Sequence, residues 1–194
     1  MDNIVLLKEY KKQRIIELAN EILNEYVIYD DNEIDIKAIL KCMDFKIELK
    51  EDFERFNKTD IGMLSIHKYF LKDKGTERVI FLDKKRSEKV KRFTLAYLLG
   101  VYALDYHGEN CYEKRLDACR YNSFYKLFAL NLLMPEELFL VKYAEFKEEY
   151  HSYVNLTKAL SYHFKVPYDR VQERYFYLNK VYQEKGKIYE YKKI

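Results

Sequence analysis

The run RFTLAYLLGVYAL at residues 92–104 constrains the fold more than any other feature of the chain. One apolar stripe recurs at the spacing of a helical turn: Phe93, Ala96, Tyr97, Gly100, Val101 and Leu104. A second apolar set widens this stripe until little polar surface remains: Leu95, Leu98, Leu99 and Tyr102. Helices that are apolar all round lie in protein interiors, so this run is predicted to be a buried helix.

The composition fits a globular protein of one domain. The 194 residues are 48% hydrophobic and 35% charged, and a net charge of +3 does not by itself indicate a nucleic-acid partner. Three cysteines without a CxxC pair argue against a disulfide framework and against a cysteine-type zinc site. The start of the chain does not read as a signal peptide, and no run approaches the roughly 20 apolar residues of a membrane span. We expect a cytoplasmic protein with no membrane contact.

The hydrophobic pattern predicts an α+β fold with a small antiparallel sheet and a mostly helical C-terminal half. Predicted helices cover 8–28, a short stretch after a cap at Asp35, Ser87 to about Asp105, Asp117–Leu133, Glu136–Tyr150, 155–164 and 168–179. Predicted strands cover 45–52, 61–70 and 78–83, with a hairpin loop at 71–77 and a further loop at 106–114. Residues 1–180 are expected to form a single domain, followed by a basic tail at 181–194.

The buried run also resembles the motif helix of the ImmA/IrrE family of zinc metallopeptidases, which reads approximately RFTLAHELGHxLL. Such a helix carries two His four residues apart, which bind zinc, and a Glu general base directly after the first His. The flanking residues, Arg92–Ala96 with Leu99 and Gly100, match this family motif closely. In this chain Tyr97 and Val101 stand where the resemblance places the His ligands, and Leu98 stands where it places the Glu.

A second stretch, LFALNLLMP at 127–135, resembles the end of the family helix that supplies the third zinc ligand. That helix reads roughly ExEAxxFAxxLLMP, so its Glu positions fall on Asn122 and Phe124. The likeness extends over about residues 10–180 and implies a zincin-like fold. Because the ligands and the base are replaced together, we expect a catalytically inactive member without catalytic residues, bound metal or cofactor.

An inactive scaffold of this kind is expected to act by binding another protein. Catalytically complete members of the family resemble regulators that cleave or inactivate repressors of mobile elements and stress responses. The resemblance therefore implies a regulatory partner, such as a repressor, and a link to a phage or plasmid. The aromatic segment 121–126, YNSFYK, is one candidate contact surface.

Two alternatives to this reading stay open at the level of sequence. Residues 155–179 have the outline of a helix-turn-helix, in which Arg170, Gln172 and Arg174 would face DNA. A peptidase with a rebuilt metal site is the other alternative. Its candidate ligands gather between the two motif helices: His107, Glu109, Cys111, Glu113, Asp117 and Cys119.

Overall fold

A computed structural model describes residues 2–26, 29–30, 33–51, 60–68, 76–105, 111–117 and 123–184. Its helices are α1 (Asp2–Tyr26), α2 (Ile36–Cys42), α3 (Glu88–Asp105), α4 (Ser123–Leu133), α5 (Glu136–Glu149), α6 (Tyr153–His163) and α7 (Tyr168–Glu184). Its strands are β1 (Tyr29–Asp30), β2 (Glu33–Ile34), β3 (Phe45–Lys50), β4 (Asp60–Lys68), β5 (Thr76–Asp83) and β6 (Cys111–Asp117). The predicted α+β class is confirmed.

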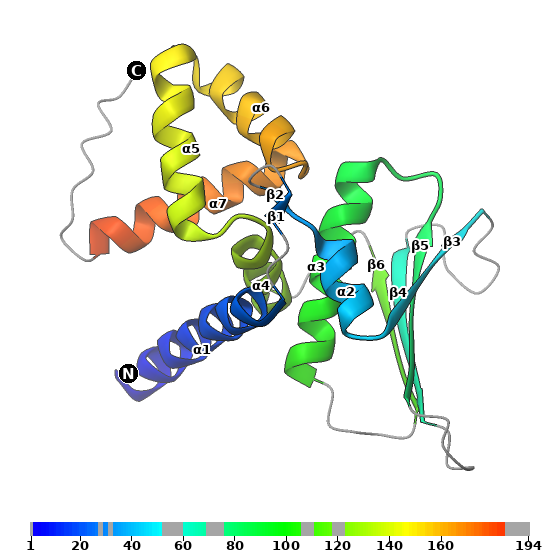
Figure 1. Ribbon diagram of the computed structural model, residues 1–194. Coiled ribbons are helices and arrows are strands. Elements are labelled where there is room, and N and C mark those ends of the chain that lie inside the picture. Colours follow the sequence, from blue (N-terminus) through cyan, green and yellow to red (C-terminus); the bar gives the residue numbers. More distant parts are fainter. Residues whose placement is uncertain are drawn as a thin grey trace.

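The helix α3 lies at the centre of the molecule, between the main sheet and the helices α1, α4, α5, α6 and α7 (Figure 1). It packs against β4 and β5 on one side and against α4 on another, while α2 also contacts it. Phe93 to Val101 are all buried, which confirms the prediction from the run 92–104. The hydroxyl of Thr94 donates to the Val90 carbonyl oxygen at 2.9 Å, so this polar group is satisfied inside the helix.

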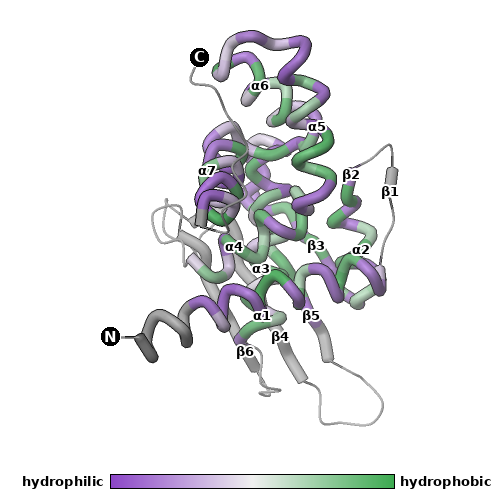
Figure 2. The backbone as a smooth tube through the Cα atoms, turned by 90° about the vertical axis from the view of Figure 1, so that its left-hand side faces the viewer, coloured by the Kyte–Doolittle hydropathy of each residue, from purple (hydrophilic) through white to green (hydrophobic). Residues whose placement is uncertain are grey.

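The helical half is built on α4, which packs against α1 as well as α3. The helix α6 contacts both α5 and α7, and these three lie beyond α4, on the side away from the sheet (Figure 1). In Figure 2, hydrophilic residues recur along α1 and α7, as expected for helices with one solvent-facing side. One cluster of buried side chains nevertheless includes residues from α1 through α7.

The main sheet differs from the prediction in its topology. Its strand order is β3-β5-β4-β6, and β3 pairs with β5 in parallel, so the sheet is mixed rather than wholly antiparallel. The antiparallel pairing of β4 with β5 agrees with the expected hairpin. The strand β5 lies between β3 and β4, so it pairs directly with both, in parallel with β3 and antiparallel with β4.

The strand β6 corrects two further predictions. Residues 106–114 were expected to form a loop and a helix was expected from Asp117, but Cys111–Asp117 pairs antiparallel with β4 and α4 begins at Ser123. At the chain ends, α1 starts at Asp2, and α7 continues to Glu184, so the first residues of the predicted tail are helical. The remaining tail and most of the predicted hairpin loop, residues 71–75, lie outside the described residues.

The predicted cap of the short helix is confirmed. The Asp35 side chain accepts hydrogen bonds from the backbone N–H groups of Lys37 and Ala38, both at 3.0 Å. These bonds satisfy two of the donors that have no partner within the first turn of a helix. Among the described residues, no helix combines the length and apolar character that crossing a bilayer requires.

Candidate functional site

The motif positions on α3 are packed into the core. Leu98 and Val101 are completely buried, and Tyr97 is 3% exposed. The Tyr97 ring meets the Tyr125 ring of α4 edge to face, with centroids 5.6 Å apart. The Tyr125 hydroxyl in turn donates to the Asp105 carboxylate at the end of α3. The two helices are therefore joined by aromatic packing at the first motif position.

Gly100 brings α3 and α4 into close approach. A Cβ at this position would lie 2.8 Å from Cδ1 of Phe128 and 3.2 Å from its Cβ. Phe128 is completely buried, so it has little room to move away. The glycine of the motif thus serves helix packing in this chain.

Phe124, at the expected third-ligand position, lies in the first turn of α4 and is half-buried against the core. The other Glu position, Asn122, lies outside the described residues. The groups at the motif positions are therefore a phenol, two aliphatic side chains and a phenyl ring. Zinc sites in proteins use thiolate, imidazole and carboxylate ligands, so these residues do not fit the metal that the resemblance implies.

The residues proposed for a rebuilt metal site are only partly described. Cys111, Glu113 and Asp117 belong to β6, whereas His107, Glu109 and Cys119 lie outside the described residues. Within the part of the chain that the structure describes, no group of three or more His, Cys, Asp or Glu residues is arranged to hold a metal ion.

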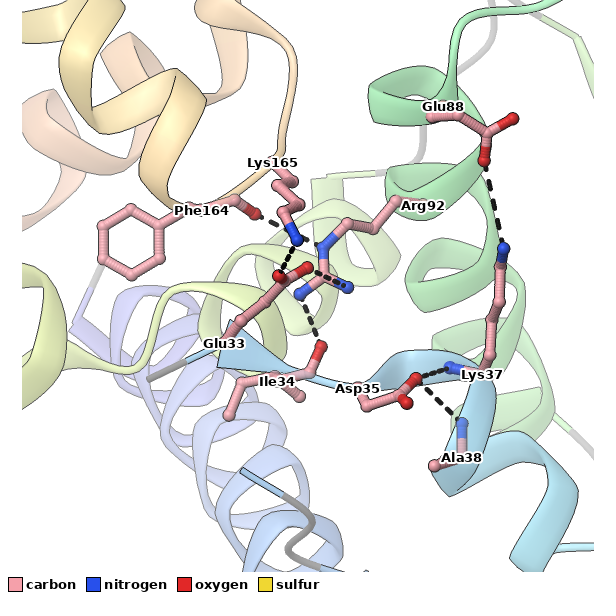
Figure 3. A network of polar contacts seen from close by, with 9 residues as sticks. All are labelled: Glu33, Ile34, Asp35, Lys37, Ala38, Glu88, Arg92, Phe164 and Lys165. Atoms are coloured by element: carbon pink, nitrogen blue, oxygen red, sulfur yellow. Dashed lines mark hydrogen bonds and ion pairs between the residues drawn. The ribbon is translucent and has the colours of Figure 1, made fainter. Parts of the chain in front are cut away.

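Arg92, one of the residues that match the family motif, connects three parts of the fold (Figure 3). Its guanidinium forms an ion pair with Glu33 at 3.0 Å and donates to the carbonyl oxygens of Ile34 and Phe164, the latter at 3.3 Å. Burial lowers the pKa of Arg92, and the negative charges of Glu33 and Asp35 act against this shift. Lys165 also pairs with Glu33, so one carboxylate is shared by two cations. Sequence comparison singled out Arg92 but gave no indication of this role.

A polar cleft of about 440 Å³ lies beside this network and is lined by charged side chains of both signs. Lys37 faces Glu88 at 3.9 Å, and Lys165 and Arg92 share Glu33. The lining holds four cations against three carboxylates, and most of these groups are paired with one another, so the cleft has only a small excess of positive charge. We interpret it as a structural junction between β2, α3 and the turn that follows α6.

The three residues proposed to contact DNA do not form an exposed surface. Arg174 is completely buried, and its Nε donates to the Met134 carbonyl oxygen at 3.0 Å. Full burial lowers the pKa of Arg174 to about 10. Arg170 is 13% exposed, pairs with Glu173 at 2.8 Å, and lies over the Phe93 ring. Gln172 is half-buried and contacts the Tyr168 hydroxyl at 3.4 Å.

This placement removes the main support for the DNA interpretation. Arg174 cannot reach a base edge from the core, and Arg170 is engaged within the protein. Both arginines lie on α7. Arg174 connects this helix to Met134, directly after α4, and Arg170 packs over Phe93 of α3. The pair of helices at 155–179 therefore closes the scaffold.

A second cleft, which sequence reasoning missed, lies among α1, α4 and α7 and has a volume of about 370 Å³. Phe124 and Lys126, from the aromatic segment at 121–126, line it. Tyr125 of the same segment is buried, and Tyr121 lies outside the described residues. The sequence did indicate an apolar face of α4, because Phe124, Leu127 and Leu130 recur every three residues. This spacing does not reveal which helices lie beside that face.

Comparison with known families gives one match. Residues 46–176 match a peptidase family model described as the IrrE N-terminal-like domain. No curated protein and no solved structure matches the chain.

Proposed function

Since the chain belongs to the family of IrrE N-terminal-like domains, we propose that it is a catalytically inactive member that acts by binding a regulatory protein. One observation carries the proposal: Tyr97, Leu98 and Val101 are buried packing residues at the positions where peptidases of this kind need ligands and a base. Without these groups, the scaffold has no means to activate a water molecule at this place.

The fold offers a reason for keeping such a scaffold. A core that includes residues from α1 through α7 holds the outer surfaces of these helices in fixed relation to one another. Surfaces of this kind bind partners without any chemistry. We propose that the partner is a repressor or another regulatory protein, that the setting is cytoplasmic, and that the system belongs to a phage or plasmid.

The loss of catalysis is tested on the full chain purified without added metal. We expect elemental analysis to find less than one zinc per chain. We also expect no cleavage of co-purifying proteins or of an unfolded protein substrate. Zinc held tightly in a 1:1 ratio, or cleavage abolished by a chelator, would overturn the proposal of an inactive member.

The binding role is tested by affinity purification of the tagged chain from its source cells, with chemical crosslinking and an unrelated tagged protein as control. We expect one regulatory protein to be enriched and to bind the purified chain in a reconstituted 1:1 mixture. Recovery of duplex DNA with no protein partner would instead favour the helix-turn-helix alternative.

A further inference from the structure

The cleft among α1, α4 and α7 has the size and lining of a small-molecule site. Its volume of about 370 Å³ falls within the range of roughly 300–1,000 Å³ that is typical of ligand pockets. One wall is formed by Phe124, Leu127 and Leu130 of α4, and another by Phe176 and Tyr177 of α7. Such pockets combine apolar walls with a few polar groups that orient the ligand.

The walls leave apolar surface for a ligand to cover. Leu127 and Leu130 are 7% and 4% exposed, so they form a firm floor that belongs to the core. Phe176, by contrast, is 59% exposed, so it presents apolar surface to solvent at the cleft. An apolar group lying between α4 and Phe176 would remove this surface from water.

The charged groups at the cleft favour a negatively charged ligand. Lys12, Lys126 and Glu173 line it. The Glu173 carboxylate already accepts from Lys126 at 3.0 Å and from Arg170 at 2.8 Å, so two cations engage it. Lys12 pairs at 2.5 Å with Glu9 of its own helix, and exposed ion pairs of this kind contribute little to the free energy of folding. The lining therefore carries two ammonium groups against one carboxylate, so a ligand carboxylate would meet a net positive charge, whereas a ligand cation would have to compete with the two cations that already engage Glu173.

We propose that this cleft binds an amphipathic monocarboxylate, whose apolar chain or ring lies against α4 and Phe176 and whose carboxylate contacts Lys126 and Lys12. The apolar walls provide the contact area, and the two lysines provide the preference for an acid over an amine of the same length. The proposal does not depend on the loss of catalysis or on a protein partner.

The test titrates the full chain with octanoate and, separately, with octylammonium, which has the same chain length and the opposite charge. Binding is measured by calorimetry and by backbone amide shifts. Octanoate is expected to bind 1:1 and to shift amides at 123–130 and 173–177, with octylammonium weaker by about tenfold. Phe176→Ser is expected to weaken both ligands and, because Phe176 is exposed, to leave folding intact.

Lys126→Gln isolates the charge contribution. It is expected to reduce the affinity for octanoate by about fivefold and to leave octylammonium unchanged or slightly tighter. Lys158→Gln, at an exposed position of α6, is the matched control and is expected to change neither affinity.

Several outcomes would overturn the assignment: no saturable binding of octanoate, equal affinity for the two ligands, or amide shifts located elsewhere. The acetylated tetrapeptide of one aspartate followed by three leucines serves as a comparison probe. If it shifts the amides at 123–130 and 173–177 and octanoate does not, the cleft is a protein contact and the small-molecule proposal is wrong.

Discussion

At the scale of single residues, Gly100 sets the distance between α3 and α4. A glycine inside a helix costs about 1 kcal/mol relative to alanine. Here the missing side chain leaves the space that Phe128 occupies, since a Cβ would lie 2.8 Å from its ring. The motif glycine is therefore explained by packing alone.

Gly100→Ala is expected to destabilise the protein by up to about 2 kcal/mol, because overpacking outweighs the gain in helix propensity. Chemical denaturation measures the effect. In a Phe128→Leu background, the same substitution is expected to cost less, since the smaller side chain can move aside. A Gly100→Ala variant more stable than the parent would show that Phe128 repacks freely.

His163 is a second residue whose surroundings determine its chemistry. Its ring meets Phe164 and Phe146 edge to face, at 4.8 Å and 5.8 Å between centroids. Its Nε2 is buried without a hydrogen-bond partner among the described residues. Burial lowers the pKa of His163 below 6.5, and the nearby Lys142 lowers it further, while Glu145 and Glu33 act in the opposite direction.

This shift predicts a loss of stability in acid. Below pH 6.5 the unfolded chain binds a proton at His163 more readily than the folded chain, so the free energy of unfolding falls as the pH drops. His163→Phe is expected to flatten that dependence between about pH 7 and pH 5. Denaturant titrations across this range measure the slope. His151→Gln, at an exposed position, is the control, and an unchanged slope in His163→Phe would refute the assignment.

At the scale of elements, α3 shows which side chains occupy the positions where the resemblance places ligands and a base. Tyr97, Leu98 and Val101 contribute buried side chains between the sheet and α4. Fully burying a side chain such as Leu98 or Val101 stabilises the fold by about 1.5–3 kcal/mol. The helix has the packing role that its all-round apolar sequence predicted.

Introducing the residues of the family motif is expected to destabilise the fold without creating a tight metal site. The triple variant Tyr97→His, Leu98→Glu, Val101→His should lose more than about 3 kcal/mol of stability, because polar groups enter a close-packed interior. It should also bind zinc weakly, since Phe124 supplies no carboxylate. Thermal unfolding and the zinc content after dialysis measure both effects.

Adding Phe124→Glu to this triple variant gives the matched comparison. Zinc binding that tightens only in the quadruple variant supports the alignment of Phe124 with the third ligand. Tight zinc binding by the triple variant would show that another residue supplies the ligand and that the alignment is wrong.

The strand β6, like the two-residue strands β1 and β2, is an element that the sequence did not reveal. Four of its seven residues are charged, namely Glu113, Lys114, Arg115 and Asp117, and they follow no clear apolar alternation. Its identity as a strand comes from backbone pairing with β4, far away in sequence. A charged strand at the outer edge of a sheet also resists pairing with other chains.

At the scale of the whole molecule, α1 is part of the core although it precedes the matched family region at 46–176. It packs against α4, and among its residues with described burial Ile15, Ala19, Ile22 and Leu23 are buried. The cleft proposed to bind a carboxylate also needs α1, which supplies Lys12. The opening helix is therefore expected to be required both for stability and for ligand binding.

Removal of residues 1–28 is expected to abolish cooperative unfolding, because it uncovers the apolar side of α4. Circular dichroism during thermal unfolding measures this, with size-exclusion chromatography as a check for aggregation. Arg14→Gln, at an exposed position of the same helix, is the control and should change stability by less than about 0.5 kcal/mol. A truncated chain that still unfolds in one sharp transition would show that α1 is dispensable.

The sequence by itself determined the features that depend on neighbours along the chain. The periodicity of α3, the cap at Asp35, the main helices and the strands β3, β4 and β5 all follow from local spacing. The motif letters around Tyr97 and Pro135 likewise led to the family, because a short pattern of residue types suffices to identify it.

Only the tertiary structure decided the features that depend on residues distant in sequence. These are the parallel pairing of β3 with β5, the strand β6, the burial of Arg174, the ion pair of Arg170 with Glu173, and the cleft shared by α1, α4 and α7. The pattern on α7 was compatible with a DNA-binding helix, because local spacing does not say which face another helix will cover. Burial and strand pairing arise from contacts between segments that the chain brings together only when it folds.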